Sequence, residues 1–184
     1  MSIDQREEQL IAQALQGNRN AFGDLYEFYL DEVYRYIFYR VSSEADAEDL
    51  TEQVFLKVWE SLHTFRQKAP FKFWLFRFAR NTIIDHYRTN KKDADFTGDV
   101  STTASDEQPE DMVRALETTA RLMRSIAKLS DLQQDVIILR FANGYNAAET
   151  AQILDRDVGT IRVLQHRALK TMQAFLVAED IVNE

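Results

Sequence analysis

The sequence has no cysteine and only 5 glycines and 2 prolines among its 184 residues. The absence of cysteine excludes disulfides, thiolate zinc sites and cysteine nucleophiles, so any redox response would have to reside in a partner. The shortage of glycine and proline leaves few turn signals and lets long helices run without interruption. We therefore expect an all-α protein.

Long apolar runs are also absent. No run approaches the roughly 18 residues that crossing a bilayer requires, and residues 1–10 are too polar for a signal peptide. The three histidines (His63, His86 and His166) are scattered, and no cluster of His, Asp, Ser or Lys stands at catalytic spacing. We expect a cytoplasmic protein without membrane insertion, metal or other cofactor, and an enzyme is the least favoured class.

The net charge of −8 conceals a segregation of charge along the chain. Segment 1–60 carries 13 acidic and 5 basic side chains, whereas 61–92 carries a single acid, Asp85, and 8 bases. Segment 93–113 holds seven acids and no base, and 114–184 holds nine of each. Nucleic acid is therefore not excluded as a partner, because the local charge of a surface governs phosphate binding.

Helical periodicity and capping residues divide the chain into two small helical domains, 1–90 and 110–184, joined by an acidic flexible linker at 91–109. The expected helices are 4–16, 20–40, 44–62, 70–88, 110–128, 130–143, 146–154 and 158–178. Their start and stop signals are Gly17, Asn20, the pair Ser43 and Asp46, the pair Ser130 and Gln133, Gly144, and the pair Asn146 and Glu149. The last two helices and their short turn form a helix-turn-helix pattern, for which an ordinary helical hairpin is the alternative.

Two groups of segments carry a resemblance to a known family. In the first domain they are 21–26 (AFGDLY), 46–55 (DAEDLTEQVF), 71–81 (FKFWLFRFARN) and 85–88 (DHYR); in the second they are 129–141, 158–162 (VGTIR) and 166–168 (HRA). In this order, with the acidic linker between them, they resemble regions two and four of the sigma-70 family, specifically its extracytoplasmic-function (ECF) group. The resemblance covers nearly the whole chain and leaves no room for region three.

The resemblance implies a bacterial alternative sigma factor, a non-enzymatic subunit that binds RNA polymerase core, recognises minus-35 and minus-ten promoter elements and initiates transcription. The implied partners are polymerase core, through its clamp coiled coil and its flap, promoter DNA, and an anti-sigma factor. The linker is either a soluble tether or, as the family implies, a segment that threads the active-site channel of the polymerase.

Two other classes stay open. One is a polymerase-binding interaction protein whose second domain binds protein rather than DNA, and the other is a stand-alone helix-turn-helix repressor. The chain departs from the family pattern at 51–53 (TEQ), at Thr150 and at 163–165 (VLQ). The last departure falls where DNA contacts are expected and is the best support for the interaction protein. A repressor would leave the acidic and aromatic motifs of the first domain without a role.

The third expected helix has two different faces at 100° per residue. Its apolar stripe consists of Ala47, Leu50, Thr51, Val54, Phe55 and Val58. The opposite arc consists of Asp46, Glu48, Asp49, Glu52, Gln53 and Leu56, with Trp59 on its edge. This arc is either a solvated acidic face or a docking patch, because exposed apolar groups ringed by acids suit a protein partner. The resemblance implies that it binds the polymerase clamp, with Asp49 as the charge anchor.

The fourth expected helix carries an apolar stripe and a basic arc. The stripe consists of Phe71, Trp74, Leu75, Phe78 and Thr82. The arc consists of Arg77, Arg80, Asn81 and Arg88, and the loop before the helix contributes Phe65, Arg66, Gln67 and Lys68. Cations on this arc can follow phosphates, and a loop with polar groups and an aromatic wall can hold an unstacked base. The resemblance implies capture of a minus-ten base; the alternative is a plain loop with Phe65 packed inward.

The last expected helix is the second helix of the helix-turn-helix pattern. Its expected buried stripe consists of Val158, Ile161, Leu164, Ala168, Leu169 and Met172. The outward residues are Thr160, Arg162, Val163, His166, Arg167 and Lys170, together with Gly159. A cationic face near a helix start suits the major groove. The resemblance implies that the six outward side chains, without Gly159, contact the minus-35 element.

Overall fold

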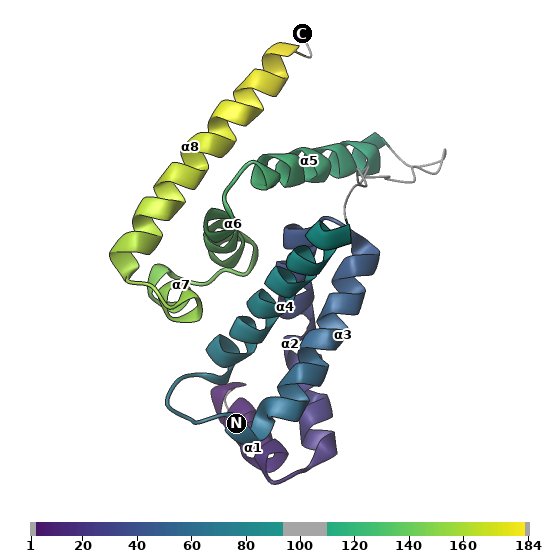
Figure 1. Ribbon diagram of the computed structural model, residues 1–184, viewed down its shortest axis with the longest axis vertical. Helices are drawn as coiled ribbons and strands as arrows, with labels where there is room; N and C mark the ends of the chain where they lie inside the picture. Colours follow the sequence, from purple (N-terminus) through teal and green to yellow (C-terminus); the bar gives the residue numbers. More distant parts are fainter. Residues whose placement is uncertain (1–2, 94–109, 183–184) are drawn as a thin grey trace. The chain divides into compact units, whose positions relative to one another are not determined.

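The computed structural model describes residues 3–93 and 110–182, which are helical apart from short turns and loops. The chain divides into two compact units, Met1–Ala94 and Asp95–Glu184 (Figure 1). The all-α expectation is confirmed for the described residues. Most of the expected linker, 94–109, lies outside them, and residues 91–93 belong to a helix of the first unit. In the described part of the chain, no helix combines the length and apolar character that crossing a membrane requires.

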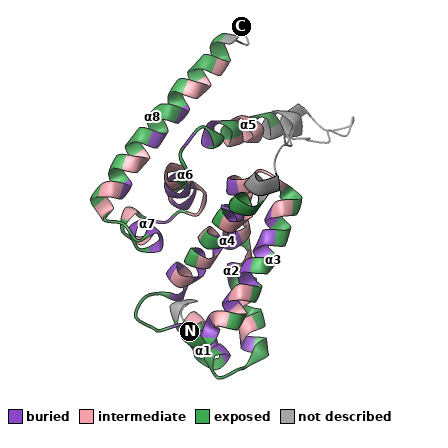
Figure 2. Cartoon of the chain, in the orientation of Figure 1, coloured by how far each residue is buried: buried purple, intermediate pink, exposed green. Residues whose placement is uncertain are grey.

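The first unit is a small helical bundle. Its elements are α1 (Ile3–Leu15), α2 (Arg19–Val41), α3 (Glu44–Ser61), the 3-10 turn η1 (Leu62–Thr64) and α4 (Phe71–Asp93). Helix α2 packs against α1, α3 and α4, and α3 also packs against α4. The buried residues face the interior of this bundle, as Figure 2 shows.

Two turns separate the first three helices. The predicted cap of the second helix is wrong, and that of the third is right. Gly17 follows α1 with a φ of 87°, a left-handed conformation that favours glycine. The cap of α2 is Asn18 and not Asn20: its Oδ1 accepts from the backbone N–H of Asn20 at 3.0 Å, because an asparagine oxygen reaches the N–H groups two and three residues ahead. The predicted cap of α3 is confirmed, since Ser43 Oγ accepts from the N–H of Asp46 at 3.3 Å.

The buried face of α4 is wider than that of α3. All six residues of the predicted α3 stripe are buried. On α4, Phe71, Leu75 and Thr82 are buried as predicted, but Trp74 and Phe78 are only half-buried. The buried set of α4 also includes Phe73, Phe76, Ala79 and Ile83. The prediction of one narrow stripe is therefore wrong, because α4 packs against two helices and a wider arc loses contact with water.

Polar contacts between helices help to stabilise the first unit. The hydroxyl of Tyr29 on α2 donates to Glu7 on α1. The hydroxyl of Tyr87 on α4 donates to the backbone oxygen of Arg40 at 2.6 Å. Lys57 Nζ donates to Thr82 Oγ1 at 3.2 Å and so joins α3 to α4. Each contact satisfies polar groups at the edge of an aromatic and aliphatic core.

The second unit contains five described elements. They are α5 (Glu110–Ala127), α6 (Asp131–Ile137), the π-helical turn η2 (Ile138–Ala142), α7 (Ala147–Leu154) and α8 (Val158–Val182). Helix α8 packs against α5, α6 and α7. The expected helix 130–143 thus changes to wider turns near its end, where the N–H of Asn143 donates to the oxygen of Ile138 at 3.0 Å.

The caps of this unit agree with the prediction. The N–H of Ser130 donates to Gln133 Oε1 at 3.1 Å. Gly144 has a φ of 77° and ends the π-turn segment. Asn146 Oδ1 accepts from the N–H of Glu149 at 3.0 Å, and Glu149 Oε2 accepts from the N–H of Asn146 at 2.8 Å. This reciprocal pair defines the start of α7.

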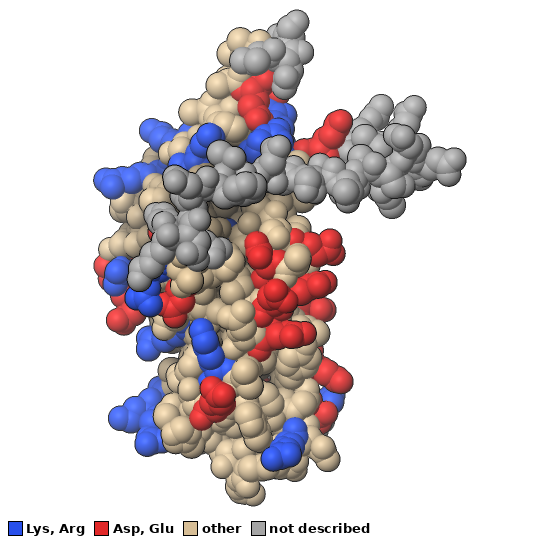
Figure 3. Space-filling view, turned by 45° about the vertical axis from the view of Figure 1, so that its right-hand side comes forward, with Lys and Arg blue, Asp and Glu red and all other residues tan. Residues whose placement is uncertain are grey.

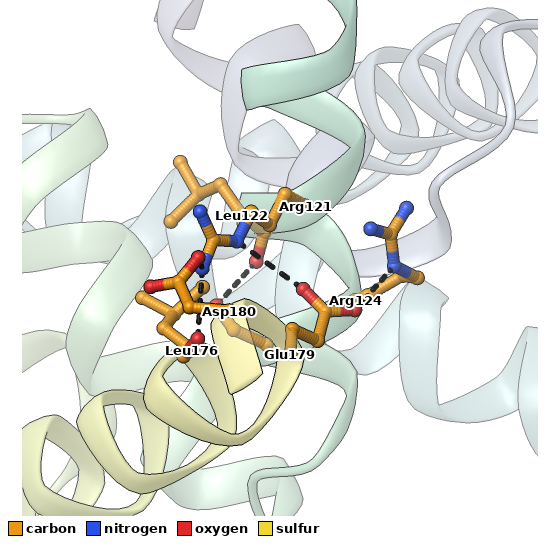
Figure 4. A network of polar contacts seen from close by, with 7 residues as sticks. Arg121, Leu122, Arg124, Leu176, Glu179 and Asp180 are labelled. Carbon is orange, nitrogen blue, oxygen red and sulfur yellow. Dashed lines mark hydrogen bonds and ion pairs between the residues drawn. The ribbon is translucent and has the colours of Figure 1, made fainter. Parts of the chain in front are cut away.

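An ion-pair network joins α5 to the end of α8 (Figure 4). Arg121 donates through Nη2 to the backbone oxygen of Leu176 at 2.8 Å, and its Nε lies 3.3 Å from Glu179 Oε2. Arg121 also pairs with Asp180, and Arg124 Nε lies 3.0 Å from Glu179 Oε1. The shared partners make this a network, which holds the first helix of the unit against its last.

Candidate functional surfaces

The outward side of α3 is an acidic face. Figure 3 shows Asp and Glu side chains gathered over this helix. Glu48, Asp49, Glu52 and Gln53 are exposed, and Asp46 is half-buried. The predicted arc is therefore present at the surface, opposite the buried stripe. Acidic side chains at this density repel phosphates and attract a basic partner.

An apolar hollow lies beside the acidic face. Leu56 is 58% exposed, and it lines the hollow together with Arg19, Phe22, Phe55 and Trp59. The rings of Phe22 and Trp59 are 4.8 Å apart between centroids. Leu56 and Trp59 were predicted on this side of α3, whereas Arg19 and Phe22, which α2 contributes, had no predicted role. The helical period of α3 alone holds no signal for them, because the hollow forms only when α2 packs on α3.

The charge of α3 reaches α2. The pKa of the Tyr34 hydroxyl is raised above its ordinary value, first by burial and then by the carboxylates of Glu44 and Glu48. Both carboxylates belong to the first turns of α3, and a negative field disfavours loss of the phenol proton. The carboxylates of Glu44 and Glu48 therefore act on α2 as well as on the surface of α3.

The loop between η1 and α4 has a buried aromatic anchor. Phe65 is only 6% exposed, and its ring lies 5.3 Å from that of Phe71 and 5.2 Å from that of Trp74. The expectation that Phe65 offers an aromatic wall to a base is wrong for this structure, because its apolar ring completes the core. Arg66, Gln67 and Lys68 are exposed, so the anchor holds a polar loop at the surface.

The basic arc of α4 is present beside this loop. Arg77, Asn81 and Arg88 are exposed, and Arg80 is half-buried. Arg88 Nη2 lies 3.1 Å from Asp85 Oδ1, but both side chains are largely exposed. A surface pair of this kind contributes little stability, so a phosphate can replace Asp85 as the partner of Arg88. The arc can therefore follow a nucleic-acid backbone.

Helices α7 and α8 form the predicted helix-turn-helix. Asp155, with a φ of 54°, makes the turn between them. The carboxylate of Asp157 caps α8: it accepts from the N–H of Thr160 at 2.8 Å and from the Thr160 hydroxyl at 2.5 Å. These hydrogen bonds lower the pKa of Asp157. Thr160 is half-buried and its hydroxyl donates to Asp157, and its predicted contact with DNA stays a prediction.

The remaining outward residues of α8 lie as predicted. Those exposed are Arg162, Val163, His166, Arg167 and Lys170. Ile161, Ala168 and Met172 are buried, and Val158 and Leu164 are half-buried. Leu169 is 41% exposed, which contradicts its assignment to the buried stripe. At 100° per residue it lies about 80° from Ile161, at the edge of the packed side.

Helix α8 is fixed to η2 by a polar contact that had not been predicted. Arg140 Nε donates to Gln165 Oε1 at 2.9 Å, and Arg140 Nη1 donates to the backbone oxygen of Tyr145 at 2.5 Å. Phe141, the next residue of η2, is 58% exposed and also had no predicted role. The helical period expected for 130–143 does not reveal it, because the π-turn changes which residues face outward.

Comparisons with known proteins agree with the two units. The family profile of Sigma-70 region 2 matches residues 25–93, and that of Sigma-70 region 4 matches residues 119–172. The ECF RNA polymerase sigma factor BldN of Streptomyces coelicolor is 37% identical over 171 residues, which cover 91% of this chain and 65% of BldN. The ECF sigma factor SigX of Bacillus subtilis is 31% identical over 168 residues, with 87% of each chain covered.

Solved structures show the same fold. The sigma factor CnrH of Cupriavidus metallidurans, in complex with the cytosolic domain of CnrY, matches with a TM-score of 0.75 and 26% identity. The match covers 94% of this chain and 98% of CnrH. RpoE of Bartonella quintana, in complex with the anti-sigma factor NepR, matches with a TM-score of 0.67 over 84% of this chain and 96% of RpoE, at 24% identity. With both regions matched in order and SigX covered along most of its length, the chain belongs to the sigma-70 family and is an ECF sigma factor.

Proposed function

We propose that this sigma factor carries RNA polymerase core to selected promoters and helps to open them, by binding and without catalysis of its own. Three surfaces divide the work: the acidic face of α3, the basic arc of α4 with its loop, and the outward face of α8. The observation that carries the proposal is the segregation of charge, acidic on α3 and basic on the arc of α4 and the first turns of α8. Polymerase and promoters lie in the cytoplasm, so we assign the protein to it.

The acidic face of α3 is the docking surface for the clamp coiled coil of core polymerase. Its exposed carboxylates supply long-range attraction and orientation, and Leu56 with the apolar hollow supplies area that loses water on binding. Asp49 is the charge anchor at the middle of the arc. Neither part alone is specific, but together they require a partner that is both basic and apolar.

The loop before α4 and the basic arc of that helix bind the minus-ten element. Arg77, Arg80 and Arg88 contact phosphates, which supplies affinity without sequence preference. Polar groups of Arg66, Gln67 and Lys68, with Asn81 nearby, hold a base taken out of the stack. Phe65 acts indirectly, because its buried ring fixes the loop to the core.

The outward face of α8 enters the major groove of the minus-35 element. Residues near the start of the second helix in a helix-turn-helix contact base edges, while more distant cations contact phosphates. Arg162 and Arg167 are the residues with guanidinium groups suited to guanine edges or phosphates, and His166 and Lys170 add polar contacts. Gln165 supports them by fixing the helix through Arg140.

Protein partners complete the proposal. The structures of CnrH with CnrY and of RpoE with NepR suggest that an anti-sigma factor controls this chain as well. We assign the α3 face as its target, since covering that face prevents assembly with core polymerase. Phe141 is our candidate for contact with the polymerase flap, because an exposed aromatic ring suits a protein better than phosphates.

The test is transcription by core polymerase plus this chain over a library of random promoters, with sequencing of the start sites. The proposal predicts transcripts that begin downstream of two recurring elements, and co-purification of the chain with core. An interaction protein would bind core and start no transcripts. A repressor would bind specific DNA without polymerase, and either result would overturn the proposal.

A further inference from the structure

One apolar side chain occupies the middle of the outward face of α8. Val163 is 48% exposed, and at 100° per residue it lies about 160° around the helix from the buried Ile161. The exposed side chains near it on this face are Arg162, His166, Arg167 and Lys170. With about half of its side chain in water, Val163 gains less from burial than the core residues of α8 do.

The space in front of Val163 is open. Side chains of a helix lean toward its N-terminus, so Val163 leans over the turn that holds Gly159. A Cβ at Gly159 would lie 3.0 Å from Asp157 Oδ1, so a side chain there would press on the carboxylate that caps α8. Because residue 159 is a glycine, the Asp157 cap is not disturbed and the methyl groups of Val163 stay accessible.

The uncharged polar side chains close to Val163 are engaged within the protein. The Thr160 hydroxyl donates to Asp157 Oδ2 at 2.5 Å. Gln165 Oε1 accepts from Arg140 Nε at 2.9 Å. Such groups read adenine or guanine edges in many complexes, but here they hold the cap and the position of the helix. Base reading by these two side chains would have to compete with those hydrogen bonds, whereas the cations and Val163 are exposed.

We propose that Val163 is a specificity-determining residue that reads one thymine of the minus-35 element through the C5-methyl group of that base. Thymine is the DNA base with an apolar group on its major-groove edge. A valine placed over the polar edge of another base would remove water from it and return no hydrogen bond. The inference rests on the proposed minus-35 role of α8.

The first experiment selects promoters with polymerase that carries either the wild-type chain or Val163→Ser. The wild type is expected to require thymine at one position, and the variant to accept other bases there while keeping its preference elsewhere. Val177→Ser is a matched control, since Val177 is 52% exposed on the same helix. It lies 14 residues further along, about 21 Å down the axis and within roughly 40° of the direction of Val163, away from the helix start.

The second experiment removes the methyl group from the DNA instead of the protein. Deoxyuridine replaces that one thymidine, and binding of the holoenzyme is measured for both chains. We expect a loss of about fourfold for the wild type, the value of one buried methyl, and no further loss for Val163→Ser. Deoxyuridine at another thymidine of the element is the DNA control, and it should not change the binding of either holoenzyme.

The outcomes separate this inference from the function on which it rests. An unaltered thymine preference in Val163→Ser, or an equal deoxyuridine loss in both chains, overturns the reading by Val163 and leaves the sigma-factor function intact. If the wild-type holoenzyme selects no promoter at all, the proposed minus-35 role of α8 fails with it. Folding of Val163→Ser is checked by circular dichroism; if it is lost, Val163→Ala, which suits a helix and removes both methyl groups, replaces it with the same expected outcomes.

Discussion

Helices α3 and α8 share one arrangement with opposite charge. On α3, Leu56 is 58% exposed among acids, and on α8, Val163 is 48% exposed among bases. The sign of the charge determines which partner can approach, because acids repel phosphates and bases attract them. The apolar residue then favours a partner with an apolar group at the matching place. A net charge of −8 therefore says little about whether this chain binds DNA.

The two faces also differ in what surrounds the apolar residue. Leu56 borders a hollow that α2 helps to form, so a protein side chain can enter it. Val163 lies on one helix, and Gly159, one turn before it, has no side chain. The methyl groups of Val163 can therefore contact the flat edge of a base pair. We infer that the first face suits a protein and the second suits the edge of a base pair.

The largest effect is expected for Asp49→Lys. Reversing a charge at the centre of the acidic face turns attraction for a basic partner into repulsion, which costs on the order of 3 kcal/mol or about a 100-fold loss of affinity for core polymerase. Affinity is measured by fluorescence titration without DNA. Glu8→Lys, an equal charge change at an exposed site on α1, is the control and should bind as the wild type does. If Asp49→Lys bound core polymerase as tightly as the wild type does, the assignment of α3 as the docking surface would be wrong.

Leu56→Ala tests the apolar part of the same face. Loss of its buried contact at the interface should weaken core binding by about tenfold, or roughly 1.4 kcal/mol. Stability should change little, because the side chain is 58% exposed in the free chain. The same titration measures the affinity, and thermal unfolding serves as the control. A variant that binds normally would mean that the charges alone account for docking.

Arg167→Ala tests the basic face and should contrast with Val163→Ser. If Arg167 holds a phosphate, its loss weakens all promoter sequences alike by several-fold and reduces the slope of log affinity against log salt by roughly one unit. Holoenzyme binding to promoter DNA at a series of salt concentrations measures the slope. A change of preference at one base position, with the slope unaltered, would instead assign Arg167 to a base edge.

The smallest effect concerns the start of α8 and depends on pH. The folded-state pKa of Asp157 is lowered, so its carboxylate stabilises the fold above its unfolded pKa, and this contribution is lost as pH falls through the folded pKa. Asp157→Asn keeps a capping oxygen but lacks the charge. The wild type should be the more stable of the two at neutral pH, and the difference should vanish in acid. Denaturant unfolding at several pH values tests this, and a difference that persists in acid would contradict it.

The sequence was sufficient wherever one helix decides the outcome. Each of the six predicted buried positions on α3 is buried, and the caps at Ser43 and Asn146 are present, because period and capping depend on neighbouring residues. The same holds for the exposed acidic face of α3 and for the cations of α8. The assigned roles of these residues remain proposals.

Features that depend on a second helix could not be predicted in this way. The sequence left two directions open for Phe65, and it packs inward because Phe71 and Trp74 contact it. The wide burial of α4 follows from its two packing partners. The hollow beside Leu56 needs Phe22 from α2. Asn18 in place of Asn20 is a smaller error, since several polar residues in succession offer alternative caps.

The most direct test of the division between the faces is the affinity of polymerase core, without DNA, for Asp49→Lys and Arg167→Ala measured side by side. Our account predicts a loss of about 100-fold for the acidic-face variant. It predicts no change for Arg167→Ala, because α8 meets DNA and not core. Wild-type affinity in Asp49→Lys, or an equal loss in both variants, would contradict the claim that opposite charges assign these two helices to different partners.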